Sequence, residues 1–424
     1  MQAIVLAAGK GTRMRSEHPK VLHEALGRPI LDYVLSILGG LGIDQPLVVV
    51  GYAARKVRSF LRTRGKESSI HPQIILQKEQ RGTGHAVMMT RSRLFAKKQD
   101  VLIWPGDMPL LKKETLEAFI QKHRTSRSEA SVLSSLRVDP AGYGRILRAG
   151  GRFFAIREEL DATPGERRIQ EVNTGVYLFR SEQLFQTLEK IRPENKKGEF
   201  YLTDCIEILS KKNARLEAFP LASSQEGQGI NSRVDLAEVT KVMNQREIEK
   251  HMERGVTFVS PEQTFVASGV KIGRDTVIYP WSYIESGVRI GRRCQIGPYA
   301  KLRKGTVIGD ESVVGSFVEV NRSKLGRKVY AKHLAYLGDA RVGDEANIGA
   351  GTITANFDGH AKHVTHIGKK ALVGSNTVFV APVTLEDHAS TGAGAVVIRG
   401  TRVKKGEVVV GVPARVLKKK GKGK

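Results

Sequence analysis

The first residues equipped for chemistry form a glycine-rich loop close to the start of the chain. A buried-strand run, Ala3 to Ala8, leads directly into Gly9-Lys10-Gly11-Thr12-Arg13-Met14. In a parallel sheet such a loop lies at the carboxyl end of the strand, where its backbone N–H groups can point at phosphates. The spacing matches neither the dinucleotide fingerprint G-x-G-x-x-G nor the Walker loop G-x-x-x-x-G-K-[ST]. The loop therefore predicts a phosphate ligand without naming its class.

The elements that would position this loop alternate between short strands and helices. Further buried-strand runs are Leu47–Val50, Ile74–Leu76, Val101–Trp104 and Ser131–Leu136. Helical patterns between several of them are Leu31–Leu41, Arg55–Arg62 and Leu116–His123. Alternating strands and helices predict an α/β domain with a doubly wound, mostly parallel, Rossmann-like sheet.

The second half of the chain follows a different rule, an apolar residue at every sixth position. The first run is Val266, Ile272, Ile278, Ile284, Ile290, Ile296, Leu302, Ile308, Val314 and Val320. The second run is Ile367, Val373, Phe379, Leu385, Thr391, Val397, Val403 and Val409. This period predicts a parallel β-helix with three flat faces per coil. Glycine follows many of these positions, and we expect it at corners whose backbone angles other residues resist: Gly273, Gly291, Gly297, Gly309, Gly315, Gly368 and Gly374.

The six-residue period is interrupted, and functional loops of solenoid proteins are inserted at such interruptions. It slips between Val320 and Val342, and thirteen rather than twelve residues separate Thr354 from Ile367. The disturbed stretches hold His333, Asn347 and Asn356. We therefore expect a second site on the β-helix.

Length, charge and cysteine content limit the class of protein. At 424 residues the chain exceeds the size of one core, so two domains are expected. The two cysteines are far apart, and no signal or transmembrane segment is visible, which predicts a soluble cytoplasmic protein. The net charge of +26 suggests the hypothesis of nucleic-acid or anionic-membrane binding, but the sequence has no nucleic-acid motif with interleaved aromatic residues. We predict no specific nucleic-acid partner and a solvated basic tail at Lys418–Lys424.

Several motifs resemble those of known enzymes. The string L-A-A-G-K-G-T-R-M with Pro19-Lys20 resembles the signature of sugar-nucleotide pyrophosphorylases. Further motifs follow in that family's order, at residues 77–86, 105–110, 142–146, 171–175, 198–204 and 229–233. With the hexapeptide repeat, the chain resembles, from Met1 to about Val409, the family of bifunctional N-acetylglucosamine-1-phosphate uridylyltransferases and glucosamine-1-phosphate N-acetyltransferases. The resemblance implies a left-handed β-helix, a homotrimer and a role in peptidoglycan and lipopolysaccharide precursor synthesis.

For the first domain, the resemblance implies transfer of UMP from UTP to N-acetylglucosamine-1-phosphate with release of pyrophosphate. Arg13 and Lys20 would contact the phosphates, and Asp107 and Asn231 would bind Mg²⁺. The uridine would lie against Leu6, Ala7, Ala8, Gly9, Gln77, Gln80, Gly82 and Thr83. The sugar would be bound by Gly144, Glu158, Asn173 and Thr174.

For the β-helix, the resemblance implies acetylation of glucosamine-1-phosphate by acetyl-CoA. The amine must be unprotonated to attack, and histidine, which titrates near neutrality, suits the role of base. His333 matches that base. The sugar phosphate would be bound by Arg303, Tyr336, Asn347 and Lys362. Acetyl-CoA would lie along Ala350, Asn356, Phe357, Ser375 and Ala393.

Departures from the family keep other hypotheses open. Asn321 stands where the family places a phosphate-binding lysine, with Arg322 beside it, and the β-helix is one to two coils shorter than usual. One alternative is a monofunctional sugar-1-phosphate uridylyltransferase whose β-helix is an oligomerisation scaffold. Another is a basic protein that binds nucleic acid or membrane surfaces. In an interpretation of the first site that assigns only structural roles, Asp107 stabilises a turn, Lys20 is a surface lysine and Asn231 caps a helix.

The predicted domain boundaries follow from these patterns. The pyrophosphorylase domain covers 1–231, a linker helix 232–255, the acetyltransferase β-helix 256–412 and the basic tail 413–424. Ser232 and Asp235 resemble a capping box for the helix, and Gly255 follows its end.

Overall fold

The structure is a computed structural model that describes residues 1–417. The backbone divides into two compact units, Met1–Val239 and Thr240–Lys424. The lysine-rich tail singled out in the sequence, Lys418–Lys424, lies outside the described residues. Of the helices in the described part of the chain, none is both long and apolar enough to cross a membrane.

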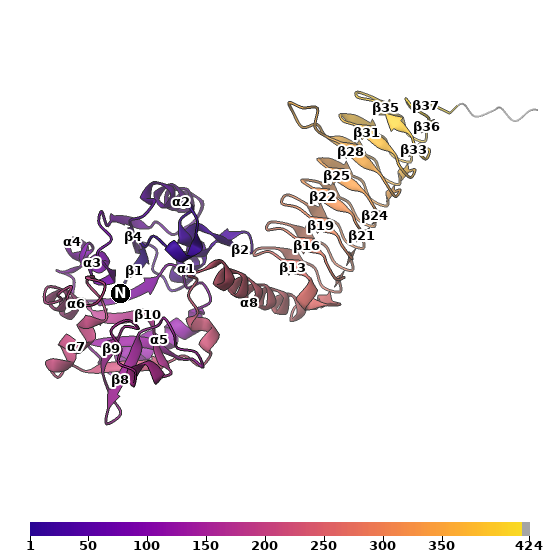
Figure 1. Cartoon of the computed structure of the whole chain (residues 1–424). Helices are drawn as coiled ribbons and strands as arrows, with labels where there is room; N and C mark the ends of the chain where they lie inside the picture. Colours follow the sequence, from indigo (N-terminus) through magenta and orange to yellow (C-terminus); the bar gives the residue numbers. More distant parts are fainter. Residues whose placement is uncertain (418–424) are drawn as a thin grey trace, which may run out of the picture. The chain divides into compact units, whose positions relative to one another are not determined.

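A nine-stranded sheet forms the centre of the first unit (Figure 1). Its strands are β1 (Gln2–Ala7), β4 (Leu47–Val50), β5 (Gln73–Leu76), β6 (Asp100–Pro105), β7 (Ala130–Leu136), β8 (Arg145–Ala149), β9 (Arg152–Arg157), β10 (Glu171–Arg180) and β11 (Leu216–Pro220). The main order is β11-β7-β10-β6-β1-β4-β5, with the β8–β9 hairpin attached to β10. Neighbours on this path are parallel except around β10, which is antiparallel to β6 and β7. The predicted mostly parallel sheet is confirmed.

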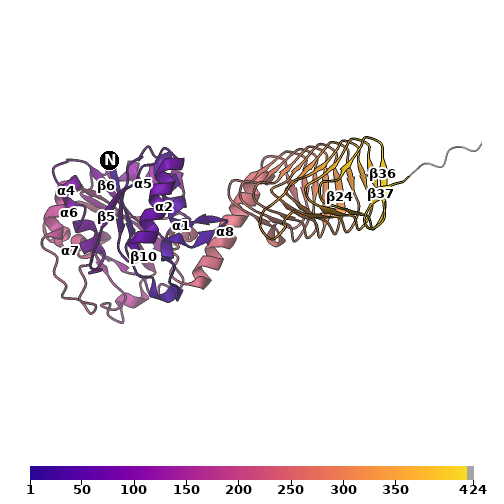
Figure 2. The same ribbon diagram turned by 90° about the horizontal axis from the view of Figure 1, so that it is seen from above.

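Helices cover both faces of this sheet (Figure 2). They are α1 (Ile30–Gly40), α2 (Ala54–Glu67), α3 (Thr83–Met88), α4 (Arg91–Leu94), α5 (Lys113–Thr125), α6 (Ser181–Leu188) and α7 (Asp204–Lys211). Because side chains alternate along a strand, Ile4 and Leu47 contribute to one core, while Val5 and Val48 contribute to the other. Helices α3, α6 and α7 pack into the first core and α1, α2 and α5 into the second. The sheet is therefore doubly wound, as predicted.

The second unit is a stack of short strands in three sheets, all parallel except β37, which is antiparallel to β36. The ten-stranded sheet holds β12 (Thr257–Phe258), β15 (Val277–Ile278), β18 (Gln295–Ile296), β21 (Val313–Ser316), β24 (Tyr330–His333), β27 (Asn347–Ile348), β30 (Leu372–Val373), β33 (Ser390–Thr391), β36 (Val408–Val410) and β37 (Arg415–Val416). One eight-stranded sheet holds β13 (Phe265–Val266), β16 (Tyr283–Ile284), β19 (Lys301–Leu302), β22 (Glu319–Asn321), β25 (Tyr336–Gly338), β28 (Ile353–Ala355), β31 (Val378–Val380) and β34 (Val396–Val397). The other holds β14 (Lys271–Ile272), β17 (Arg289–Ile290), β20 (Val307–Ile308), β23 (Lys324–Leu325), β26 (Ala340–Val342), β29 (Thr365–Ile367), β32 (Val383–Leu385) and β35 (Arg402–Val403).

The strand register confirms the period of six. Ile278 pairs with Ile296 eighteen residues later, which is one coil of three six-residue faces. The apolar positions of both runs are buried, apart from the partly buried Ile272. At the predicted slip the pairing distance falls to seventeen residues, as between Val320 and Leu337. After Thr354, where the sequence suggested one extra residue, the distance rises to twenty-five, between Thr354 and Phe379, so the interruption is seven residues long. The left-handed β-helix of hexapeptide repeats is thereby confirmed.

Our explanation for the glycines of the β-helix was wrong at most positions. Of those named above, only Gly297 has a left-handed backbone, with φ of 96°. At the others a side chain would strike the backbone of the next coil, as at Gly273, where a Cβ would lie 2.7 Å from the Arg292 nitrogen. Close stacking of coils, rather than corner geometry, therefore requires these glycines.

Two hairpin strands, β2 (Glu24–Ala25) and β3 (Arg28–Pro29), also belong to the first unit, and α8 (Arg233–Met252) begins in that unit and continues past its end at Val239. The predicted capping box is present, because the Ser232 N–H donates to Asp235 (2.8 Å) and the Asp235 N–H donates to Ser232 (3.2 Å). Gly255, with φ of 84°, follows the end of the helix, and its N–H donates to the Met252 carbonyl.

Candidate active sites

The first candidate site is a cavity of about 390 Å³ at the carboxyl ends of β1, β5 and β6. Most of the predicted nucleotide-binding residues line it, namely Leu6, Ala7, Ala8, Gly9, Lys20, Gln77, Gln80, Gly82, Thr83 and Asp107. Lys10, Val21, Ala86, Pro105 and Glu199 line it as well, although no role was assigned to them from the sequence. Glu199 could have been found, because it stands in one of the motifs that carry the family resemblance.

Glycines allow the cavity walls to approach one another. Gly11 has φ of 61°, and a Cβ there would lie 2.9 Å from the Cβ of Lys20, so the loop bends against the lysine. Gly82 has φ of 106°, and its Cβ would meet the Phe200 carbonyl at 2.5 Å. The buried Gln77 side chain donates to the Gly82 carbonyl (3.2 Å). These residues fix the loops that surround the cavity.

Lys20 joins the two predicted metal ligands. Its ammonium donates to the carboxylate of Asp107 and to the side-chain oxygen of Asn231 (3.2 Å). The Ile230 N–H also donates to the Asp107 carbonyl (3.0 Å), and the Asn231 N–H donates to Asp235 (2.8 Å), so backbone bonds hold both ligands. The Asn231 side chain faces Lys20 and leaves helix capping to Ser232.

The donor set fits a hard divalent cation. The Asp107 and Asn231 oxygens already converge on one cationic group, the Lys20 ammonium. Two protein oxygens suffice for an ion such as Mg²⁺ when substrate phosphates and water complete its shell. In residues 1–417 there is no group of three or more His, Cys, Asp and Glu side chains that could hold a metal ion. A site in this unit would therefore depend on the substrate for its remaining ligands.

The predicted sugar residues lie together but outside the cavity lining. The Asn173 N–H donates to the Gly144 carbonyl (2.8 Å), and a Cβ on Gly144 would lie 3.5 Å from the Glu158 carboxylate. The Asn173 amide donates to the Tyr177 hydroxyl (2.7 Å). The buried Thr174 hydroxyl donates to the Leu133 carbonyl (2.7 Å), so it supports the fold at this position. Arg13 is exposed and does not line the cavity.

A group of acids lies beside this sugar region. Burial raises the pKa of Glu158, whose carboxylate accepts a hydrogen bond from Thr203 (3.2 Å). Burial, followed by the charges of Glu158 and Glu207, raises the pKa of Asp204 from 3.8 to about 6, while Arg157 opposes the shift. Asp204 therefore loses its proton at higher pH in the folded protein than in the unfolded chain.

This shift predicts a pH-dependent effect of Asp204→Asn on stability. Because the folded protein retains the Asp204 proton between about pH 4 and about pH 6 and the unfolded chain loses it, this residue's contribution to stability falls as pH rises through that window. The variant should melt roughly 2–4 °C above the wild type at about pH 8, with a smaller difference at about pH 5. Thermal unfolding followed by circular dichroism at both pH values measures this. Exposed Asp44→Asn is the matched control, and an equal gain at both pH values would contradict the assignment.

The second candidate site follows one corner of the β-helix. Ser316 pairs with His333, and the Gly351 N–H donates to the Leu334 carbonyl (3.0 Å), which places Ala350 on the coil after His333. The Asn376 N–H donates to the Ala350 carbonyl (2.7 Å), and the Gly394 N–H donates to the Ser375 carbonyl (2.8 Å). The structure therefore aligns predicted residues of the acetyl transfer on consecutive coils, in the order His333, Ala350, Ser375 and Ala393. Ala350, Ser375 and Ala393 have small side chains and form a column on the coils that follow the exposed imidazole of His333.

The neighbouring sheet and loop carry the remaining predicted residues. Arg303 forms ion pairs with Glu319 (3.1 Å) and Glu285 (3.6 Å), and the phenol of Tyr336 lies over Gly338, where a Cβ would be 2.6 Å from its oxygen. Asn347 lies on β27 in the ten-stranded sheet. Phe357 and Lys362, both exposed, pair across the loop inserted between β28 and β29.

Asn321 and its neighbour belong to a network that the sequence did not reveal. Arg322 donates to both oxygens of Asp339 (2.8 and 2.7 Å) and to the side chain of Asn321 (3.1 Å). Asn356 donates to the same Asp339 carboxylate. Hydrogen bonds from Arg322 hold the pKa of Asp339 below its ordinary value. Arg322 is therefore engaged within the protein and is not a free replacement for the family's lysine.

Comparisons with known proteins recognise both units. A family model described as a MobA-like NTP transferase domain matches residues 3–199. The model for bacterial transferase hexapeptide repeats matches residues 269–303 and 287–322, and that for the hexapeptide repeat of succinyl-transferase matches residues 364–399.

Curated relatives match almost the whole chain. "Bifunctional protein GlmU" of Heliobacterium modesticaldum is 42% identical over 431 residues, which cover 94% of this chain and 93% of that protein. The protein of the same name from Pelotomaculum thermopropionicum is 41% identical over 417 residues, 90% of each chain. That of Geobacillus sp. is 39% identical over 429 residues, 93% of this chain and 92% of the relative. This chain belongs to the GlmU family.

Membership of the GlmU family confirms the two activities predicted from the motifs. The chain is a bifunctional enzyme with a uridylyltransferase unit and an acetyltransferase unit. The scaffold-only and surface-binding hypotheses are not needed to account for the β-helix. The individual residue roles stay predictions.

Proposed function

We propose that the first cavity binds UTP and N-acetylglucosamine-1-phosphate and transfers UMP between them. The observation that carries this proposal is the meeting of Lys20, Asp107 and Asn231 beside a cavity lined by the predicted uridine residues. A phosphate oxygen of the sugar phosphate attacks the α-phosphorus of UTP, and the bond from that phosphorus to the leaving pyrophosphate breaks. Such a reaction needs alignment and positive charge more than covalent help from the protein.

The residues of this unit would divide the work between charge and position. Lys20, together with Arg13 from the glycine-rich loop, would contact phosphate oxygens as negative charge develops on pyrophosphate. A divalent cation, which we propose to be Mg²⁺, would be held by Asp107 and Asn231 and would neutralise phosphate charge. Gly144, Glu158 and Asn173 would orient the sugar. Thr174 would act only by supporting Asn173, because its hydroxyl is committed to the Leu133 carbonyl.

For the β-helix, we infer that His333 is the base of acetyl transfer. It would take a proton from the amine of glucosamine-1-phosphate as the nitrogen attacks the thioester carbonyl of acetyl-CoA, and the C–S bond would break to release CoA. The column of small residues Ala350, Ser375 and Ala393 would hold acetyl-CoA beside it. Arg303, Tyr336, Asn347 and Lys362 would bind the sugar phosphate, while Asn356 and Phe357 would complete the acetyl-CoA side.

An exposed apolar column supports the proposal of a homotrimer. Trp281, Tyr299 and Phe317 are each about half exposed and stack on one another, with ring centroids 6.3 and 4.9 Å apart. Leu334, next to His333, is 61% exposed. Neighbouring copies would cover such a surface and close the acetyl-CoA groove. We place the enzyme in the cytoplasm because both cysteines, Cys205 and Cys294, are free.

Separate assays with each substrate pair test this function. UTP with N-acetylglucosamine-1-phosphate should yield pyrophosphate and UDP-N-acetylglucosamine. Acetyl-CoA with glucosamine-1-phosphate should yield free CoA. If only the first pair reacts, the β-helix is a scaffold and the acetyltransferase residues above are wrongly assigned.

The loop between β28 and β29 predicts a role for Arg399. The Asp358 carboxylate accepts hydrogen bonds from the Ala361 N–H (2.8 Å), the Arg399 guanidinium (2.6 Å) and the His363 imidazole (2.7 Å). These bonds hold the pKa of Asp358 far below its usual range, and the bond from the Ala361 N–H contributes most to this shift. Arg399 thereby ties down the loop that carries Asn356 and Lys362.

Arg399→Ala should therefore loosen substrate binding in the acetyl transfer. Because exposed ion pairs contribute little free energy, KM for glucosamine-1-phosphate should rise about fivefold or less, with little change in kcat. Uridylyl transfer should not change. Arg402→Ala, which removes an arginine paired with Glu386 on the same β-helix, is the control. Equal effects of the two variants would show that the loop contact has no special role.

A further inference from the structure

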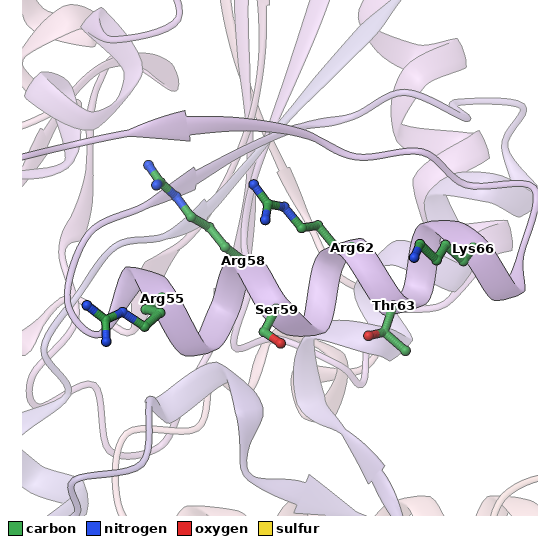
Figure 3. Close-up of a pocket in the computed structure, with 6 residues that line it drawn as sticks. All are labelled: Arg55, Arg58, Ser59, Arg62, Thr63 and Lys66. Carbon is green, nitrogen blue, oxygen red and sulfur yellow. The ribbon is translucent and has the colours of Figure 1, made fainter.

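Helix α2 carries a row of cationic side chains, of which Arg55, Arg62 and Lys66 are exposed and Arg58 is half-buried (Figure 3). A groove of about 490 Å³ along the helix is lined by Arg55, Arg58, Ser59, Arg62, Thr63 and Lys66. At 3.6 residues per turn these positions fall on one face of the helix. We call Arg55, Arg58, Arg62 and Lys66 the cationic stripe.

The cationic stripe is not neutralised by the part of the chain that the structure describes. None of its four side chains has an ion-pair partner there, and the Nε of Arg58 is buried without an acceptor. By contrast, Arg64 on the same helix is paired with Asp32, which also accepts Arg28. Successive members of the stripe lie three or four residues apart, so they repel one another.

The fold does not require the stripe. The other side of α2 supplies Val57 and Leu61 to the core, and both are buried. A helix face that is merely solvated ordinarily carries charges of both signs. An uninterrupted row of one sign, on a chain of net charge +26, instead indicates an anionic partner.

The dimensions and composition of the groove define that partner. From Arg55 to Lys66 the stripe extends about 16 Å at 1.5 Å per residue, so it matches a chain of phosphates better than a single phosphate. The groove has no aromatic lining residue on which bases could stack. The apolar residues of α2 are committed to the core, which leaves no apolar face for a bilayer.

We propose that the cationic stripe docks the sugar-phosphate backbone of single-stranded RNA without regard to base sequence. Its cationic groups contact successive phosphates. The hydroxyls of Ser59 and Thr63 bond phosphate oxygens and ribose 2′-hydroxyls. This surface is independent of the two transferase sites, and it accords with the prediction of no specific nucleic-acid partner.

Fluorescence anisotropy with an oligoadenylate RNA of about 16 nucleotides tests the proposal between about 50 and about 200 mM salt. Adenylate avoids the uridine specificity of the catalytic cavity, and excess UTP should not compete. The test variant replaces all four residues of the stripe with glutamine, which keeps helix propensity. The control replaces four exposed cations of the β-helix with glutamine: Lys271, Arg289, Lys301 and Lys324.

The wild type and the control should bind the RNA with a steep salt dependence. The stripe variant should bind at least about tenfold more weakly at low salt. The magnitude of its slope of log K against log salt should also be smaller by about 3, because each of the four lost phosphate contacts accounts for about 0.7. Equal losses in variant and control would mean that only net charge matters, which overturns the proposal. Absence of wild-type binding also overturns it. So does stripe-dependent capture by anionic phospholipid vesicles without stripe-dependent RNA binding. Retained uridylyl transfer shows that the stripe variant is folded.

Discussion

Asp107→Ala should lower uridylyl transfer by about 10³-fold or more while acetyl transfer stays near the wild-type rate. Asp107 lies two residues after the end of β6, the strand beside β1, and its carboxylate accepts a hydrogen bond from Lys20. Its removal deletes a proposed metal ligand and frees the Lys20 ammonium to move. Acetyl transfer should persist because its proposed residues belong to a different unit with its own core.

Two assays on the same preparation measure this separation. Pyrophosphate release reports the first activity, and free CoA reports the second. Asp44→Ala, which removes an exposed carboxylate of the same unit, should change neither. Undiminished UDP-sugar synthesis by Asp107→Ala, or by the wild type in excess chelator, would refute the metal assignment.

His333→Ala should lower acetyl transfer by about 10²- to 10⁴-fold, the usual cost of losing a general base. The imidazole is exposed at the foot of the small-residue column, where the amine and the thioester are proposed to meet. The loss should appear mainly in kcat, because the base acts in the transition state more than in binding.

The matched control for this variant is His366→Ala. His366 is an exposed histidine of the same β-helix but lies on β29, in a different sheet. CoA release monitored with a thiol reagent should be nearly normal in this control. If His333→Ala retains wild-type kcat, another residue must be the base.

Much of the fold could be predicted because its patterns are local. The run Leu47–Val50 is the strand β4 without change, since a fully buried parallel strand reads as a continuous apolar stretch. The six-residue period predicted the coils and located the slip, but it indicated one extra residue after Thr354 where the structure has seven. The hairpin β8–β9 and the long strand β10 were not predicted. The Gly150-Gly151 pair, with φ of 54° and 79°, was the available signal for that hairpin.

The candidate sites were harder to predict because they join distant segments. No spacing rule brings Asp107 and Asn231 together, and only motif order suggested it; in the structure both accept from Lys20. The burial of individual side chains also could not be predicted from the sequence. It withdraws Thr174 from the cavity, raises the pKa of Asp204 to about 6 and separates the paired Arg64 from the unpaired stripe on the same helix.

Mixing two variants tests most directly the claim that one chain carries two separate active sites. Asp107→Ala and His333→Ala are each incubated alone with glucosamine-1-phosphate, acetyl-CoA and UTP, and are then combined. Each alone should form almost no UDP-N-acetylglucosamine, while the mixture should form it at a substantial rate, because N-acetylglucosamine-1-phosphate made by the first variant reaches the intact uridylyl site of the second. A mixture as inactive as its components, with both variants folded, would contradict the claim.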